Sequence, residues 1–296
     1  IFFDTIVDKY LDYIKDYFPW ILIDGKPREK TGLVSGITFF GGCLLYIIHF
    51  KNWGKHLDYL IMYNVLYLLV DHYMDDPNIN IKDKTDNLEI MNELLLDPGK
   101  RYEISDNKSL NFHIAELYEK IITQYPKSRK YICKLFFSQK EGMCNKTKTR
   151  NEIKQITFDK GGITMEILCC MVDGDYNQAY KIGKVMQCID DCIDIKDDIE
   201  NNIFTVPVHD FQKENNINLF FSQIVDYIND IDEYYFLYKC VYSSMLVYIT
   251  DKHKDLFDKS LIDMCKKYYV MSYDININNP TSDIINRRLA NILDKH

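Results

Sequence analysis

Glycine and proline are scarce in this chain of 296 residues, which contains 12 glycines and 7 prolines. Such low counts exclude collagen-like and low-complexity sequence, and they argue against an all-β fold with many tight turns. A basic excess is also absent, because 36 lysines and arginines face 44 acidic residues and leave a net charge of −8. A protein that binds a phosphate backbone should carry a basic patch, so we expect no nucleic-acid partner.

Paired cysteine spacings are missing as well. The nine cysteines form no Cys-x-x-Cys, and most lie in apolar helical runs. This pattern predicts buried free thiols in a reducing compartment, and we expect a cytoplasmic protein. Because the chain begins at Ile1 rather than at methionine, we expect a further segment before it.

A membrane-spanning segment is not expected either. Residues 33–50 contain no Asp, Glu, Lys or Arg. The length of this uncharged stretch is at the short end of what a membrane-spanning helix needs. Three glycines interrupt this stretch, and the mean hydropathy of the chain is −0.27. We therefore interpret it as a buried core helix rather than a stable membrane span.

Helical periodicity is what the sequence does contain. Apolar residues make up 47% of the chain and recur at intervals of three and four, whereas period-two alternation is rare. Turn residues at 24–27, 97–99 and 173–175 separate these segments, as does Pro77, and Pro207 and Pro280 mark two loops. The expected helices are 4–18, 31–50, 54–76, 86–96, 108–124, 127–140, 150–172, 176–200, 213–228, 230–250, 254–270 and 281–294. No repeat or long linker divides them, so we predict one all-α domain over residues 1–296, a bundle of about 12 helices.

The first acidic cluster ends a strongly apolar run. Asp71 and Asp75 are four residues apart and share one face of the predicted helix, and Asp76 follows them. The helix macrodipole disfavours negative charge at this C-terminal end. A bound cation would relieve that penalty.

The second acidic cluster forms a stripe along another predicted helix. Asp190, Asp194 and Asp198 are spaced four apart, with Gln187 and Asp191 beside them and isoleucines on either side. A solvated face is the usual meaning of one such run, because stacked carboxylates repel each other in apolar surroundings. Two runs on separate apolar helices favour divalent cations, and Mg²⁺ prefers such oxygen ligands.

These residues resemble motifs of the class I isoprenoid synthase superfamily. Segment 71–76 looks like its DxxxDD motif, and segment 187–194 looks like its QxxDDxxD motif. The three spaced aspartates of the second cluster also fall on the positions of the NSE motif of terpene synthases. Asp159-Lys160-Gly161-Gly162 is similar to a segment of bacterial members of the superfamily.

The resemblance implies an α-helical barrel in which two acidic motifs face each other across an apolar cavity. It implies three Mg²⁺ ions that bind the diphosphate of an isoprenyl substrate, and an allylic cation that then cyclises or is quenched by water. A class I terpene synthase acting on geranyl or farnesyl diphosphate is the closest match. The implied metal ligands are Asp71, Asp75, Asp76, Asp190, Asp191, Asp194 and Asp198.

The resemblance also implies basic residues that contact the diphosphate. Lys160, just before an expected Gly-Gly helix break, is the first candidate, and Arg150 and Lys154 are its rivals. Lys267-Tyr268 looks like a lysine variant of the Arg-Tyr pair of terpene synthases.

Gln187, Phe39 and Tyr67 are the expected substrate-contacting residues besides these cations. Tyr67 lies one turn before Asp71, so we expect its ring toward the floor of the cavity, where a tyrosine would limit the length of the substrate. Cation–π contacts from such rings would stabilise the carbocation.

Three other functions stay open. Gly25-Lys26-Pro27-Arg28 is similar to an element of chain-elongating prenyltransferases, although no Arg-Arg pair follows the first acidic cluster. The DxxxDD spacing also occurs in squalene and phytoene synthases. A non-catalytic isoprenoid-binding protein is the third alternative, and a homodimer is left open.

Overall fold

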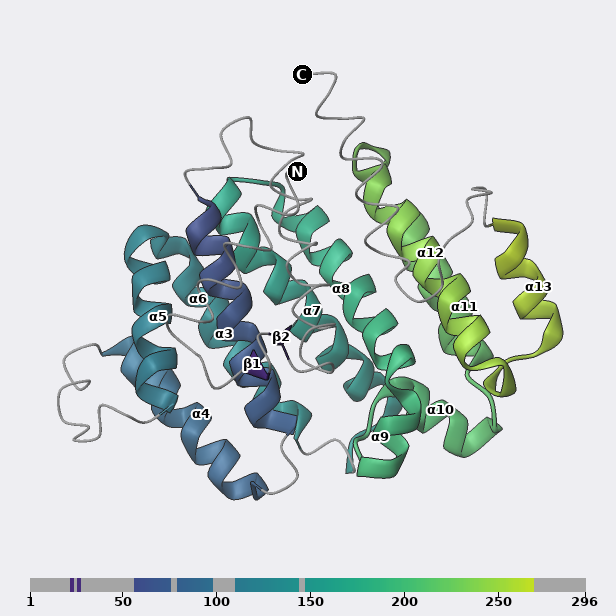
Figure 1. The fold of residues 1–296 in the computed structure, drawn as a ribbon, viewed down its shortest axis with the longest axis horizontal. Helices are drawn as coiled ribbons and strands as arrows, with labels where there is room; N and C mark the ends of the chain where they lie inside the picture. Colours follow the sequence, from purple (N-terminus) through teal and green to yellow (C-terminus); the bar gives the residue numbers. More distant parts are fainter. Residues whose placement is uncertain are drawn as a thin grey trace.

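The computed structural model describes residues 22–23, 26–27, 56–75, 79–97, 110–143 and 147–268, and these ranges are mainly helical (Figure 1). The all-α prediction is therefore confirmed for the described residues. Their α-helices are α3 (Leu57–Asp75), α4 (Ile81–Leu96), α5 (Leu110–Gln124), α6 (Arg129–Gly142), α7 (Arg150–Val172), α8 (Tyr176–Ile193), α9 (Ile195–Asn201), α10 (Val206–Glu214), α11 (Asn218–Asn229), α12 (Phe236–Lys252) and α13 (Lys259–Tyr268).

Short elements complete the description. The 3-10 helices are η4 (Pro126–Ser128), η6 (Glu233–Tyr235) and η7 (Lys254–Leu256). Strands β1 (Leu22–Ile23) and β2 (Lys26–Pro27) pair antiparallel, with Leu22 opposite Pro27. The sequence predicts a turn over residues 24–27, and the structure places Lys26–Pro27 of that range in β2.

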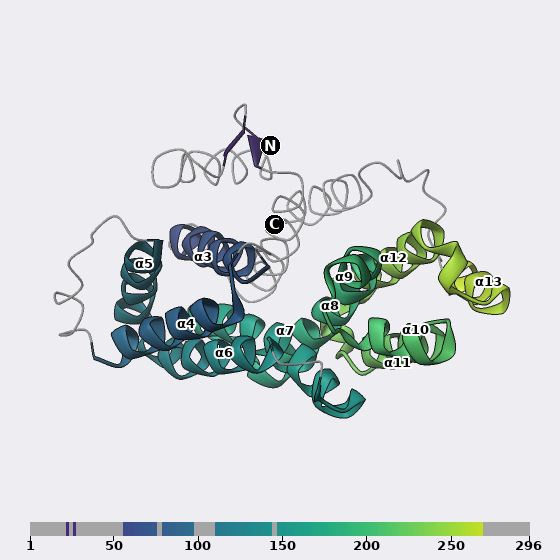
Figure 2. The ribbon, with the colours of Figure 1, turned by 90° about the horizontal axis from the view of Figure 1, so that it is seen from below.

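Helices α7 and α8 lie in the middle of the described helices (Figure 2). Helices α3 to α6 pack on one side of this antiparallel pair, and α9 to α13 lie on the other side. The buried core continues through both sides and is built mainly of leucine, isoleucine and aromatic side chains. The α7–α8 pair is therefore the centre against which α3, α6, α10, α11 and α12 pack.

Glycines allow α7 and α8 to approach very closely. A methyl group on Gly161 would lie 2.1 Å from the carbonyl oxygen of Gly183, and one on Gly183 would lie 2.0 Å from that of Gly161. The ring of Tyr180 similarly covers Gly162, where a methyl group would lie 2.4 Å from Cδ2. The expected helix break at Gly161-Gly162 is thus wrong, because both glycines lie inside a continuous helix and make room for its neighbour.

Caps explain where the two central helices begin and end. Thr149 and Glu152 form a capping box at the start of α7, and the carboxylate of Asp175 accepts backbone N–H bonds at the start of α8. Asp173 ends α7 in the left-handed conformation, at φ 50°. The predicted break at residues 173–175 is confirmed.

Other helix boundaries differ from the prediction. Pro207 lies in the first turn of α10 rather than in a loop, because a proline there loses no helical hydrogen bond. Asn215 ends α10 at φ 56°, which divides the helix expected over 213–228. The expected helices 4–18, 31–50 and 281–294 lie outside the described residues.

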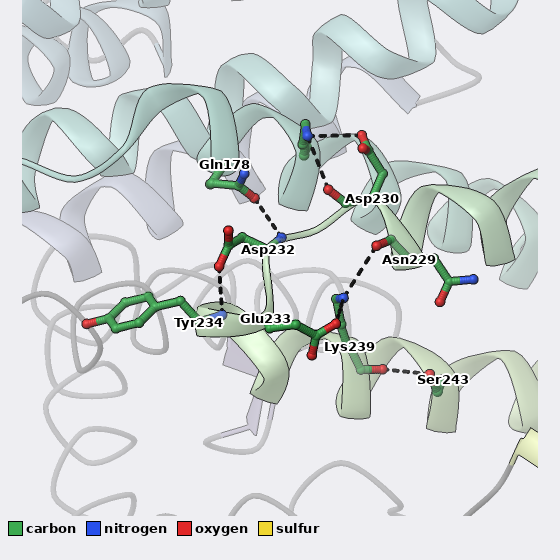
Figure 3. Close-up of polar contacts among 9 residues, drawn as sticks. Gln178, Asn229, Asp230, Asp232, Glu233, Tyr234, Lys239 and Ser243 are labelled. Atoms are coloured by element: carbon green, nitrogen blue, oxygen red, sulfur yellow. Dashed lines mark hydrogen bonds and ion pairs between the residues drawn. The ribbon is translucent and has the colours of Figure 1, made fainter.

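A polar cluster fixes the connection between α11 and α12 to the start of α8 (Figure 3). The side-chain oxygen of Gln178 accepts a hydrogen bond from the backbone of Asp232 at 3.0 Å. Lys181 forms an ion pair with Asp230 at 3.1 Å, and Lys239 forms one with Glu233. The contacts of Gln178 and Lys181 hold the helices on the right of Figure 1 to the central pair.

Two other predictions can be compared with the described residues. Six cysteines are free thiols there, and three of them are buried while the other three are half-buried. No helix in the described ranges is long and apolar enough to cross a bilayer. The apolar stretch 33–50 lies outside those ranges.

The close contact of α7 and α8 predicts a large cost for a single methyl group. Gly183→Ala should lower the free energy of unfolding by about 3 kcal/mol, because its Cβ meets backbone that cannot move unless the helices separate. Chemical denaturation measures this change. Gly142→Ala is the matched control, since its Cβ meets no backbone but the flexible end of Lys160 at 3.1 Å and a methyl group of Ile156 at 3.5 Å, and it should be nearly neutral. Equal effects of the two substitutions would contradict the packing account.

Candidate functional site

The acidic stripe of the second cluster is bent rather than straight. Helix α8 ends at Ile193, Asp194 adopts φ −93° and ψ 4°, and α9 begins at Ile195. The prediction of one helix over 176–200 is therefore wrong. The carbonyl of Ile193 leaves the helical ladder and instead accepts hydrogen bonds from Lys252 and His253, at 2.9 Å each.

The backbone keeps the stripe together across this bend. The N–H of Asp194 donates to the carbonyl of Asp190 at 3.1 Å, and the N–H of Asp198 donates to that of Asp194 at 2.8 Å. Asp190 and Asp194 are half-buried, while Asp198 is buried. Thr205 donates a hydrogen bond to the carboxylate of Asp198 at 3.1 Å. The three predicted aspartates thus stay one turn apart.

Asp191 is the most enclosed carboxylate of the site. Thr157 of α7 donates to its Oδ2 at 2.9 Å, and Gln187 donates to its Oδ1 at 3.2 Å. Burial nevertheless raises the pKa of Asp191 to about 6, with the two hydrogen bonds and the charge of Lys160 acting in the opposite direction. The fold holds this group where its charged form is disfavoured.

Gln187 connects the two helices that carry the acidic clusters. Its amide nitrogen also donates to Asp190 at 3.2 Å, and its amide oxygen accepts a hydrogen bond from the hydroxyl of Tyr67 on α3 at 3.4 Å. One turn beyond this contact lie position 71 on α3 and Asp191 on α8. The two clusters, far apart in the sequence, are therefore brought to the same level of the bundle.

The directions of α3 and α8 support this alignment. Tyr63 lies beside Thr164 of α7, and Tyr67, one turn later, reaches Gln187 of α8. Since α7 and α8 are antiparallel, α3 runs parallel to α8, and both acidic ends lie toward the lower side of Figure 1. Parallel helices place two C-terminal ends, each with negative dipole charge, next to each other.

Lys160 is the basic residue that the structure brings to this site. It lies one turn after Thr157 on α7, and its charge favours the ionised form of Asp191. Its ammonium group also lies against Gly142 at the end of α6. Within the described ranges Lys160 has no ion-pair partner, so its charge is available to an anion.

The rival cations are placed differently. Arg150 forms a bidentate ion pair with Asp210 of α10, at 2.6 and 2.7 Å, and this pairing raises its pKa. Lys154 lies 5.9 Å from the ring centre of Phe158. No described contact brings either one to the acidic stripe.

Several predicted site residues cannot be placed. Asp71 and Asp75 lie in the last turns of α3, and Lys267 and Tyr268 end α13, but their side chains lie outside the described part of the chain. Two further predicted residues lie wholly outside it, Phe39 and Asp76.

Sequence reasoning missed the residues that hold the aspartates. Thr157 and Thr205 each donate to a predicted metal ligand, and His253 with Lys252 fixes the bend of the stripe. Thr157 could have been found, because it shares a helix face with Lys160 at a spacing of three. Thr205 depends on the loop between α9 and α10, and Lys252 and His253 depend on contacts between distant segments.

The site offers carboxylate oxygens, which suit Mg²⁺, but not a complete set of protein ligands for a metal ion. In the described part, no three His, Cys, Asp or Glu side chains are arranged to share one metal ion. Mg²⁺ usually takes only one or two protein carboxylates and completes its shell with water and substrate phosphate. The half-buried Asp190 and Asp194 offer ligands of that kind.

No protein-family model matches the chain, and no curated protein matches it.

The raised pKa of Asp191 predicts a pH-dependent penalty in the metal-free protein. Because the folded pKa is above the unfolded value of about 4, stability falls as pH rises from about 4 to about 6 and is then level. Asp191→Asn removes the charge but keeps groups for both hydrogen bonds. It should therefore be more stable than the wild type by roughly 3 kcal/mol above pH 7, with the difference disappearing near pH 4.

Urea denaturation in the presence of a chelator, over pH 4 to 8, measures this difference. The control is Asp197→Asn, which changes an exposed neighbour. A difference between Asp191→Asn and wild type that does not vary with pH would contradict the burial of a charged Asp191.

Proposed function

We propose that this protein is a class I terpene synthase, which ionises an acyclic isoprenyl diphosphate such as geranyl or farnesyl diphosphate. The observation that carries the proposal is the contact between Tyr67 and Gln187 on parallel helices. It supports a common site for two acidic clusters that are far apart in the sequence. A shared site would explain why both apolar helices end in carboxylates at the same level.

The proposed reaction requires that the site stabilise the negative charge that develops on the leaving diphosphate. Bound Mg²⁺ would supply that stabilisation as a Lewis acid, held by Asp190, Asp194 and the acidic end of α3. Lys160 would contact the diphosphate from the side of α7. Gln187 holds Asp190 and Asp191 in place through two hydrogen bonds.

The aromatic ring of Tyr67 has a second part in the proposal. It is buried, with 6% of its surface exposed, and its hydroxyl is directed to Gln187. Its ring lies one turn before the acidic end of α3, next to the place proposed for the diphosphate. There it would face the allylic cation and shield it from water.

Product analysis tests this proposal. The purified protein is incubated with Mg²⁺ and geranyl, farnesyl or geranylgeranyl diphosphate, with and without isopentenyl diphosphate. Hydrocarbons or alcohols formed without isopentenyl diphosphate support a terpene synthase. Longer diphosphates would establish chain elongation instead, and binding without turnover would establish an isoprenoid-binding protein.

Both acidic clusters should be needed for turnover. Asp190→Ala and Asp71→Ala should each reduce kcat by about 100-fold or more, because each removes a charge that offsets the leaving group and its cations. Release of diphosphate measures the loss, and circular dichroism verifies the fold. Asp197→Ala, which removes an exposed acid of α9, should retain wild-type activity. A folded Asp71→Ala protein with normal turnover would contradict a shared site.

Lys160 should bind the diphosphate directly. Lys160→Ala should lower kcat/KM by about 10- to 100-fold, the usual value of a hydrogen bond to a charged group, and Lys160→Arg should recover part of it. Steady-state kinetics with a single isoprenyl diphosphate provides the values. Lys154→Ala is the control. If it lowers kcat/KM more than Lys160→Ala does, Lys154 rather than Lys160 binds the diphosphate.

A further inference from the structure

The ammonium group of Lys184 on α8 lies between aromatic rings rather than beside a carboxylate. Its Nζ lies 4.1 Å from the ring centre of Tyr227 on α11 and 5.2 Å from that of Phe158 on α7. The two rings meet edge to face, with their centres 5.3 Å apart. Among the described residues, the side chain of Lys184 forms no ion pair and no hydrogen bond. Cation–π contacts therefore hold this amine in place without a counter-ion.

Two further lysines lie near this amine. The ammonium of Lys154 on α7 lies 5.9 Å from the centre of the same phenylalanine ring, and Lys181 precedes Lys184 by about one turn of α8. The charges of both act on Lys184. Asp230 is the acid whose charge reaches Lys184, but its carboxylate is paired with Lys181 at 3.1 Å. Lys184 thus lies in a local excess of positive charge.

These surroundings disfavour the charged form of Lys184. Burial lowers its pKa, and the charges of Lys181 and Lys154 lower it further, against the charge of Asp230. The neighbouring thiol of Cys188 adds no charge, because burial raises the pKa of that thiol well above its ordinary value. The Lys184 side chain is only half-buried, and its Nζ is not among the fully enclosed polar atoms that lack a partner. A small molecule from solvent can therefore reach an uncharged amine here.

We propose that Lys184 reacts reversibly with CO₂ and forms a carbamate. The lone pair of the uncharged amine adds to the carbon of CO₂, an N–C bond forms, and one C=O electron pair moves onto oxygen. The nitrogen then releases its extra proton to solvent. One amine and one CO₂ thus give one carbamate anion and one proton, and no oxidant, reductant or activated donor is needed. This modification is independent of the proposed terpene synthase chemistry.

The charges around Lys184 favour the product of this reaction. Carbamate formation replaces a positive charge on the side chain by a negative one, so the cations that disfavour the ammonium form stabilise the carbamate. Lys154 is the expected partner, because it comes from the neighbouring helix α7 and forms no ion pair in the described part of the chain. A carbamate on α8 that pairs with Lys154 would link the two central helices.

Chemical trapping locates the carbamate. The purified protein is equilibrated at neutral pH with ¹³C-labelled bicarbonate, which supplies CO₂, and is alkylated with triethyloxonium, which converts a carbamate into a stable ester. Peptide mass spectrometry then identifies the labelled lysine. The label at Lys184 should exceed that at Lys181 by about tenfold, because the ion pair with Asp230 stabilises Lys181 as an ammonium. Lys181 is therefore an internal control in the same protein.

Two variants separate the amine from its surroundings. Lys184→Arg keeps the positive charge but cannot add CO₂, so dissolved CO₂ at matched ionic strength should raise the unfolding midpoint of the wild type and not of this variant. Lys154→Ala should lower the label at Lys184 about threefold, because one cation that favours the carbamate is gone. Lys196→Ala is the matched control, since Lys196 is paired with Asp255 at 3.1 Å, and it should leave the label unchanged.

The wild-type protein alone decides the assignment. Label concentrated at Lys184 supports it, and so does a CO₂-dependent midpoint that Lys184→Arg abolishes. Equal label at Lys184 and Lys181, or no label at either, overturns it even if a variant fails to fold. Label at Lys184 that Lys154→Ala leaves unchanged overturns the pairing with Lys154.

Discussion

The contact between Gly161 and Gly183 is the constraint on which the described structure depends. Backbone meets backbone there, since a methyl group on either glycine would lie about 2 Å from the carbonyl oxygen of the other. This contact fixes how far α7 can slide along α8. It sets Thr157 opposite Asp191 and brings Lys160 to the same carboxylate. The position of the proposed site therefore depends on Gly161 and Gly183, which lie one to two helical turns from it and have no side chains.

The same geometry makes the site energetically costly. Asp191 is held in a buried position that raises its pKa to about 6, so ionising it at neutral pH costs the folded protein free energy. Protein interiors rarely contain a buried carboxylate that has no function, because a neutral or apolar residue in its place would make the folded protein more stable. A cation bound nearby would remove the penalty, and clusters of perturbed groups are typical of functional sites. The Asn64 amide, fully buried without a hydrogen-bond partner among the described residues, belongs to the same pattern of polarity retained inside an apolar bundle.

Among the described residues, sequence patterns predicted where helices form better than where they begin and end. The helix expected over 150–172 matches α7, and the turn at residues 173–175 that ends it is a local signal. The bend at Asp194 could not be predicted, because it depends on hydrogen bonds from Lys252 and His253 to the carbonyl of Ile193. These residues are about sixty positions apart in the chain. Gly161 and Gly162 were misinterpreted for the same reason, because only the neighbouring helix shows why they are glycines. The pairing of Gln187 with Tyr67 likewise required the fold, although both had been selected for separate reasons.

The central claim is that the acidic ends of α3 and α8 form one site that binds a diphosphate through divalent cations. Calorimetric titration with inorganic pyrophosphate tests it without any assumption about the isoprenoid. The account predicts binding in the presence of Mg²⁺ and none with a chelator, and it predicts that Mg²⁺ binds more tightly once pyrophosphate is present, because linkage is reciprocal. Pyrophosphate binding of equal strength with and without Mg²⁺ would contradict it.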